Sequence, residues 1–357
     1  MKADQVWADL LKAGLVQGAS PELSVRSPWF VRVMLGVAGW FGALFLLFFV
    51  GLAMSFIFKN AAAALVLGAG ACAVAAMLFR KFPEHDFAGQ FAFAVSLAGQ
   101  ALIIFGIADA IGKSVGPVAF VMAGVQAALF WLVPNYLHRV WAAWTGVCAL
   151  ALALADGGLS AFTPALVLAA FAWVWLKEFD LAKHATLVRA GGYGLALAAV
   201  MVAVFVHGEF SIRRILDHPG PPAGGLIGIW IGAALTAAAL LWAVVQLLAR
   251  EHVPLESAQG RIALAGALIL ALATLKAPGI GPAAALLVIG FANGNRILAG
   301  LGIIAMLGYL SHYYYSLQIT LLEKSAVLAA TGVALLAARL ALLRYWPASK
   351  SEEVPHA

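Results

Sequence analysis

The side chains with the greatest capacity for chemistry gather toward the end of one apolar segment near the C-terminus. They are Tyr309, His312, Tyr313, Ser316 and Thr320. Helical spacing places the hydroxyl groups on one broad helix face, where they could line a site that opens outward with the imidazole beside it. If the segment crosses a membrane, a belt of aromatic side chains at the interface explains the tyrosines without any site. The spacing alone leaves both interpretations open.

Three glutamines form a second group, because each lies inside a stretch of apolar residues. Gln90 and Gln100 fall within about 80° of each other on one helix face, and Gln126 lies in the next apolar segment. Hydrocarbon offers an amide no water, so these side chains must face other helices or a cavity. They indicate either hydrogen bonds between helices or a pathway for a polar ligand or ion.

A strip of small residues is a third feature of the sequence. Gly224, Gly228 and Gly232 recur at every fourth position, followed by Thr236. Because no side chain stands on this strip, the backbone of another helix can approach it closely. The spacing therefore predicts a helix-packing face.

Two connections between apolar segments are interrupted by glycine and proline. One contains Asp156-Gly157-Gly158 and then Thr163-Pro164, and the other runs from Pro278 to Pro282. The flanking segments would be only about 18 to 24 Å long as helices, against a hydrocarbon core of roughly 30 Å. Short, interrupted pairs are typical of broken helices around a transporter site. Plain short spans with polar caps are the simpler interpretation.

Familiar catalytic and metal-binding signatures are missing from the sequence. Gly112-Lys113-Ser114 resembles the end of a phosphate-binding loop, but Gly106 lies one residue too far upstream. The stretch 207–218 holds two His, one Glu and one Asp without a ligand pair at helical spacing, and two adjacent arginines would oppose a cation. Cys72 and Cys148 lie in apolar stretches and predict small buried side chains. We therefore expect no enzyme activity, no catalytic residues, no metal and no cofactor.

Composition indicates which class of protein must position these groups. Of the 357 residues, 64% are apolar and 11% are charged, whereas soluble domains have about 45–50% and about 25%. At roughly 20 residues a span, this apolar content could fill about eleven or twelve membrane helices. The net charge of +6 is typical of basic cytoplasmic loops and does not indicate nucleic-acid binding. The sequence predicts an all-α polytopic transmembrane helical bundle with about 12 spans.

Apolar patterning divides the chain into three parts. Residues 1–28 are predicted as a cytoplasmic segment with a short amphipathic helix, 29–346 as the transmembrane bundle, and 347–357 as a cytoplasmic tail. The predicted spans are 33–58, 61–79, 87–108, 115–133, 140–155, 162–176, 187–207, 225–249, 262–275, 280–292, 297–312 and 325–343.

Lysine and arginine predict the orientation of the bundle. With the N-terminus in the cytoplasm, most of the 22 Lys and Arg fall on the cytoplasmic side. Arg139, Arg189 and Arg296 each lie at the inner start of an outward-going helix. We therefore expect a multi-pass protein of the bacterial inner membrane with both termini in the cytoplasm.

Several motifs carry a resemblance to a known family. They are Ser27-Pro28-Trp29-Phe30-Val31-Arg32, Ala98-Gly99-Gln100, and Tyr313-Tyr314-Tyr315-Ser316-Leu317 followed by Thr320-Leu321-Leu322. With them the chain resembles, over nearly its whole length, an uncharacterised bacterial multi-pass membrane family, domain of unknown function 4401. The resemblance implies no activity and no catalytic residue. It implies a partner, because similar families are found beside a smaller membrane-anchored protein named for a Gly-Asp-Tyr motif.

On these grounds we expect an integral inner-membrane protein that is the non-catalytic membrane subunit of a bacterial envelope assembly. The alternative is a transporter or channel for a small solute or lipid-like molecule. The expected partners are the lipid bilayer and a smaller membrane-anchored protein of the Gly-Asp-Tyr motif family, with no nucleic acid. A cavity reaching Gln100 and Gln126 would favour transport, and an apolar groove beside the Gly224 strip would favour the subunit.

Overall fold

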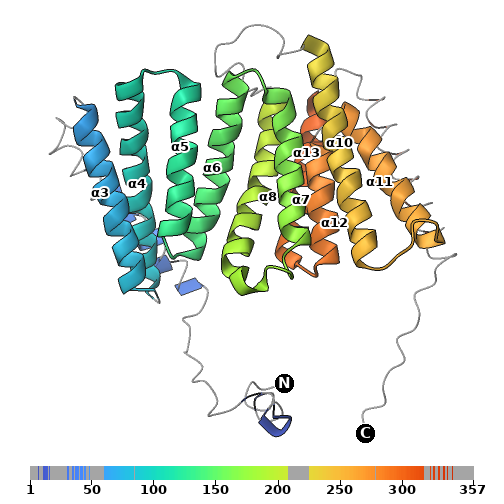
Figure 1. Cartoon of the computed structure of the whole chain (residues 1–357), viewed down its shortest axis with the longest axis horizontal. Helices are drawn as coiled ribbons and strands as arrows, with labels where there is room; N and C mark the ends of the chain where they lie inside the picture. Colours follow the sequence, from blue (N-terminus) through green and yellow to red (C-terminus); the bar gives the residue numbers. More distant parts are fainter. Residues whose placement is uncertain are drawn as a thin grey trace. The chain divides into compact units, whose positions relative to one another are not determined.

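The computed structural model of the protein describes residues 60–83, 85–207, 225–277 and 279–316, with separate positions between 7 and 48 and between 322 and 340. The chain divides into two compact units, Met1–Gly112 and Lys113–Ala357. Within the described ranges the chain consists of helices and the short turns that join them, and no strand occurs there (Figure 1). The predicted all-α fold is therefore confirmed.

The described ranges contain ten α-helices and two short 3-10 turns. The helices are α3 (Ala61–Lys81), α4 (Asp86–Ile111), α5 (Val115–Leu132), α6 (Tyr136–Asp156), α7 (Thr163–Leu176), α8 (Ala185–His207), α10 (Gly225–Arg250), α11 (Ala258–Lys276), α12 (Ile280–Ala292) and α13 (Arg296–Ser316). The 3-10 turns η2 (Ser160–Phe162) and η3 (Ala182–His184) precede α7 and α8. Ten predicted spans coincide with these helices. The predicted spans 33–58 and 325–343, the segment 1–28 and the tail 347–357 lie wholly or largely outside the described residues.

Polar capping residues determine where several helices begin. The side-chain oxygen of Asn60 accepts a hydrogen bond from the backbone N–H of Ala62 at 2.9 Å. Asn135 caps α6 in the same way, and Ser257 caps α11. Such a cap satisfies one of the N–H groups that the first turn of a helix leaves free. For this reason α6 and α11 begin before the first residue of the predicted apolar spans.

In the first unit, α3 and α4 form a hairpin in which the two backbones come very close. A Cβ on Gly68 would lie 2.7 Å from the carbonyl oxygen of Gly99, and a Cβ on Gly99 would lie 2.7 Å from that of Gly68. One turn further along, the thiol of Cys72 donates to the carbonyl of Ser96 at 3.7 Å. Only glycine at the crossing allows this approach, which is typical of tightly packed membrane helices.

In the second unit, successive helices run alternately in opposite directions (Figure 1). The C-terminal ends of α5, α7, α10 and α12 therefore lie on the same side as the N-terminal ends of α6, α8, α11 and α13. Most of the basic residues described in this unit lie on that side, which we call the basic side. They are Arg139, Lys177, Lys183, Arg189, Arg250, Arg261 and Arg296. It is the side that the distribution of Lys and Arg predicts to face the cytoplasm.

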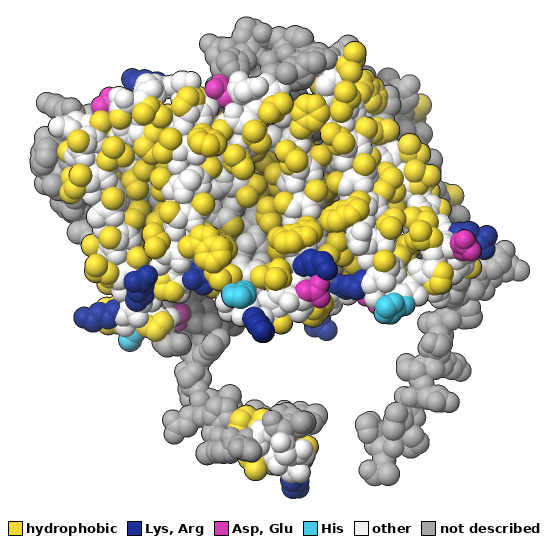
Figure 2. All heavy atoms as spheres, in the orientation of Figure 1, with side chains coloured by type: hydrophobic (Ala, Val, Ile, Leu, Met, Phe, Trp, Pro, Cys, Tyr) yellow, Lys and Arg dark blue, Asp and Glu magenta, His cyan; other side chains and the backbone are white. Residues whose placement is uncertain are grey.

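The core of the second unit lies where α7, α8, α10 and α12 pack together. Its largest fully buried side chains include Trp175, Phe171, Leu240 and Leu286. Hydrophobic side chains cover the visible outer face of this unit, and charged groups and histidines gather along one end (Figure 2). A surface of this kind suits lipid around the helices and water at their ends.

Helix length and composition identify a membrane-embedded protein. Among the described residues, seven helices are long and apolar enough to cross a membrane, and three further apolar helices are shorter. Two of the shorter helices, α7 and α12, have 14 and 13 residues. At 1.5 Å per residue each is about 20 Å long, against roughly 30 Å for the hydrocarbon core of a bilayer.

Candidate functional site

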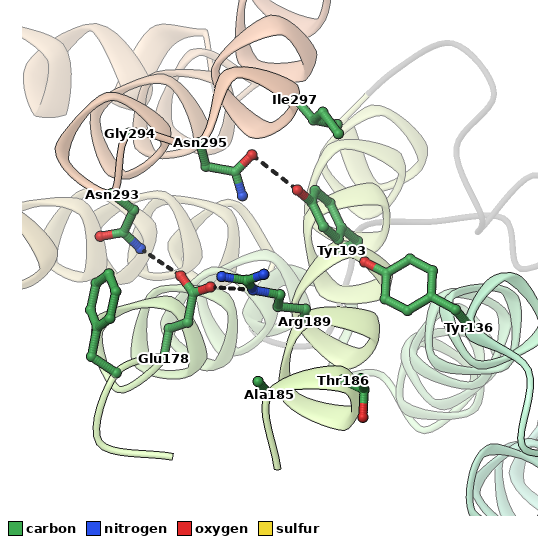
Figure 3. A pocket seen from close by; sticks show the side chains of 11 residues that line it. Tyr136, Glu178, Ala185, Thr186, Arg189, Tyr193, Asn293, Gly294, Asn295 and Ile297 are labelled. Atoms are coloured by element: carbon green, nitrogen blue, oxygen red, sulfur yellow. Dashed lines mark hydrogen bonds and ion pairs between the residues drawn. The ribbon is translucent and has the colours of Figure 1, made fainter. Parts of the chain in front are cut away.

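A pocket of about 500 Å³ lies on the basic side of the second unit, among the ends of several helices (Figure 3). Its wall comes from α6, α8 and α13 and from the turns that follow α7 and α12. The lining residues are Tyr136, Glu178, Phe179, Ala185, Thr186, Arg189, Tyr193, Asn293, Gly294, Asn295 and Ile297. Seven of these eleven side chains carry a polar group, whereas 64% of the whole chain is apolar.

Glu178 is the buried charge of the pocket, with only 6% of its surface exposed. Its Oε1 accepts a hydrogen bond from Nε of Arg189 at 2.7 Å, and its Oε2 accepts one from Nδ2 of Asn293 at 3.3 Å. A carboxylate at this depth is tolerated only when it is paired and hydrogen-bonded. Both of its oxygens are therefore engaged by neighbours from α8 and from the end of α12.

Asn293 joins the ends of three helices. Its Nδ2 also donates to the backbone carbonyl of Trp175 at 3.0 Å, in the last turn of α7. Its Oδ1 accepts from Nη1 of Arg250, the last residue of α10, at 2.9 Å. One amide side chain thus satisfies a carbonyl that the end of α7 leaves free and holds α10 beside α12.

Tyr193 and Asn295 form the opposite wall of the pocket. The hydroxyl of Tyr193 donates to Oδ1 of Asn295 at 2.9 Å, and the same oxygen accepts from the backbone N–H of Leu298 at 3.1 Å. The ring of Trp175 packs edge-on against Tyr193, with centroids 5.1 Å apart. A Cβ on Gly192 would lie 2.9 Å from this indole, so a glycine makes room for it.

The two short helices bring the central residues of the pocket together. Glu178 lies two residues after the end of α7, and Asn293 follows α12 directly. The turn after α12 passes through Gly294 with φ of +63°, and the N–H of Asn295 then donates to the carbonyl of Gly290 at 2.8 Å. A positive φ favours glycine, so the local sequence suits this sharp turn.

The three glutamines singled out from the sequence do not line this pocket. Gln100 and Gln126 are each 4% exposed, and Gln90 is half-buried. In the first unit, Nε2 of Gln100 donates to the hydroxyl of Ser96 on the preceding turn at 3.2 Å. In the second unit, a Cβ on Gly146 would lie 3.0 Å from Cβ of Gln126.

The aromatic cluster of α13 lies toward the opposite end of that helix from the pocket. The ring of Tyr309 fills the space where Gly279 has no side chain, and His312 is exposed. The side chains of Tyr313 and Ser316 lie outside what the structure describes, and so does the whole of Thr320. The outward-opening site at this cluster therefore stays a prediction from the sequence.

The glycine strip of α10 lies partly against the chain's own backbone. A Cβ on Gly232 would collide with the carbonyl of Ala161 in η2, and Gly228 is buried. Gly224 lies outside the described residues. At Gly232 the strip thus lies against a neighbouring turn of the same unit.

Sequence reasoning missed the central residues of the pocket. It did not single out Glu178, Asn293 or Asn295, and it used Arg189 only to predict orientation. The available signal was indirect, because Glu178 and Asn293 follow the two short segments whose glycine and proline interruptions had been noted. The pocket offers hydrogen-bond donors, acceptors and one ion pair. The described residues contain no group of three His, Cys, Asp or Glu placed to hold a metal ion.

Together these features define a class: an all-helical, membrane-embedded protein with a polar pocket at one end of its larger unit. The chain matches the family described as domain of unknown function DUF4401 over residues 28–345, and it belongs to that family. The family predicted from the sequence motifs is therefore confirmed. Comparison with curated proteins and with solved structures gave no match.

Proposed function

We propose that this protein is a membrane transporter for a small polar solute, and that the pocket on the basic side is its binding site. The observation that carries this proposal is the position of the two short helices. Both α7 and α12 end at the pocket, and the residues that follow them, Glu178 and Asn293, are hydrogen-bonded to each other. Short or broken helices whose ends meet at a polar site are typical of secondary transporters.

The packing beyond the pocket supports a state that is open to one side only. Past Tyr193, α8 continues into the core through Ala196 and Ala199, neither of which has any exposed surface. Trp175 and Leu286 fill the same region from α7 and α12. A pocket open to the basic side and closed by packed side chains on the other side fits one half of an alternating-access cycle.

The orientation predicted from Lys and Arg indicates the side of the membrane to which the pocket of the proposed transporter opens. If the basic side faces the cytoplasm, the described conformation is inward-open in the bacterial inner membrane. The role of a non-catalytic subunit with a smaller membrane-anchored partner remains a prediction from the family resemblance. The pocket itself favours transport.

Cysteine accessibility tests the proposal without knowledge of the solute. In a background with Cys72→Ala and Cys148→Ala, single cysteines replace Thr186 in the pocket wall or Ala199 in the packed core. A membrane-impermeant maleimide is applied to sealed vesicles from each side, and labelling is measured by gel shift. Ala75→Cys is the matched control, because this alanine of α3 also has no exposed surface.

Transport requires access from both sides of the membrane. Thr186→Cys should be labelled quickly from the basic side. Ala199→Cys should be labelled from the other side at on the order of 0.1–10% of that rate, the usual population of a minor conformation. If Ala199→Cys reacts no faster than Ala75→Cys from either side, the proposed transport is wrong.

A further inference from the structure

The free hydrogen-bonding capacity of the pocket consists mainly of donors. Both oxygens of Glu178 already accept hydrogen bonds, from Arg189 and Asn293. Oδ1 of Asn295 accepts from Tyr193 and from the backbone of α13. The carboxylate and this amide oxygen are thus engaged by the protein itself, whereas the terminal nitrogens of Arg189 and Nδ2 of Asn295 take part in none of the hydrogen bonds found among the described residues.

Arg189 supplies the strongest of these donors. It donates to Glu178 through Nε, and its side chain is 56% exposed. None of the hydrogen bonds found among the described residues uses its two terminal nitrogens. The guanidinium lies between Glu178 and Tyr193, with the amide nitrogen of Asn295 turned toward the same space (Figure 3). Two terminal nitrogens in a fixed fork match the oxygens of a carboxylate or phosphate.

Three helix N-termini add to this positive potential. Tyr136 is the first residue of α6, Ala185 and Thr186 are the first two of α8, and Ile297 is the second of α13, and all of them line the pocket. Each helix carries roughly half a positive charge at its N-terminus, which attracts anions. The convergence of three such ends beside an arginine favours a negatively charged ligand.

We propose that the pocket binds the anionic oxygens of a phosphate or carboxylate group, held by the terminal nitrogens of Arg189 and by Nδ2 of Asn295. The inference rests on the proposed function only in taking the pocket as the ligand site. A free solute or the headgroup of an anionic lipid can present this chemistry, and exposed apolar residues beside the pocket, such as Phe179, could accommodate a lipid.

The test measures binding to the purified full-length protein in neutral detergent. Inorganic phosphate and succinate are the solute probes, with chloride at equal ionic strength as the reference, and thermal unfolding is the readout because a ligand of the folded state raises Tm. Phosphatidylglycerol and phosphatidylcholine are the lipid probes, compared by native mass spectrometry. The two arms distinguish a free anion from a lipid headgroup.

The decisive variant is the double substitution Glu178→Gln and Arg189→Gln, which removes both charges and leaves amides that can hydrogen-bond. Arg189→Lys is the second variant; it keeps a positive partner for Glu178 but loses the fork of donors. Arg261→Gln is the matched control, because this exposed arginine lies on the basic side at the start of α11, away from the pocket.

We expect the wild-type protein to bind phosphate, succinate or phosphatidylglycerol. The affinity of the double variant for the same probe should be at least about tenfold lower than that of the wild type. Arg189→Lys should also weaken binding, and Arg261→Gln should not. If no probe binds, or if the double variant and Arg189→Lys bind like wild type, the anion site is wrong. Anion binding without labelling of Ala199→Cys would support the anion site and contradict transport. Labelling of Ala199→Cys without anion binding would support transport and contradict the anion site.

Discussion

The α3–α4 hairpin and the pocket end of the second unit hold their helices together by different means. In the hairpin, backbones meet at Gly68 and Gly99, and close packing replaces ionic contacts at the crossing. At the pocket, helix ends are joined by an ion pair and by the amide of Asn293. Contact between small residues is sufficient to pair helices in a membrane. The polar network therefore joins the helix ends and, at the same time, places charged and amide groups around the pocket, where they could bind a ligand.

The largest effect is expected at the glycine crossing of the hairpin. Gly99→Val would place side-chain atoms against the Cys72 thiol and the Gly68 carbonyl, and the carbonyl cannot move without separating the helices. We expect a loss of about 3 kcal/mol in stability, the upper range for overpacked sites. Thermal unfolding in detergent measures it. Gly70→Val, on the same hairpin with open space around it, should be close to wild type, and equal effects of the two changes would contradict backbone packing.

An intermediate effect is expected at the amide that joins the helix ends. Asn293→Ala leaves the Trp175 carbonyl and Arg250 without this partner, and leaves Glu178 with Arg189 alone. Loss of hydrogen bonds to charged and buried groups predicts destabilisation of about 2 kcal/mol. The same unfolding assay applies, with exposed Gln259→Ala as the control. A neutral Asn293→Ala would mean that the network has no role in holding this end together.

The smallest effect is expected at the tyrosine of the pocket wall. Tyr193→Phe removes one hydrogen bond, but the ring still packs on Trp175 and Asn295 still caps α13. A change in stability of about 1 kcal/mol or less is therefore predicted. Tyr315→Phe, at a side chain that is 78% exposed, should have no measurable effect. A larger loss of stability in Tyr193→Phe than in Asn293→Ala would contradict the expectation that the amide of Asn293 contributes more to stability than the hydroxyl of Tyr193.

The helices could be predicted because their signal is local. Long apolar runs identify α3, α4 and α10 to within a few residues, and the errors at α6 and α11 come from caps that extend a helix beyond its apolar stretch. The confirmed family also rested on local motifs. A run of residues contains its own evidence for a membrane helix, and no distant contact is needed to recognise it.

The pocket could not be predicted in the same way because its evidence is distributed. Glu178 and Asn293 are 115 residues apart, and each alone has the pattern of an ordinary polar residue at a helix end. The sequence shows the two short segments, but nothing in it indicates that they lie side by side. Helices α7 and α12 pack together in the fold, because packing partners are selected by the shapes of their surfaces and not by distance along the chain.

The contrast between the hairpin and the pocket extends to the order in which the molecule is assembled. Cys72 and Ser96 meet across only 24 residues, so α3 and α4 can pair while the ribosome is still synthesising the rest of the chain. Trp175 and Asn293 are 118 residues apart, and the amide cannot reach its carbonyl until α12 has entered the bilayer. Until then, of the two hydrogen-bond partners of the Glu178 carboxylate, only Arg189 of the next helix is available.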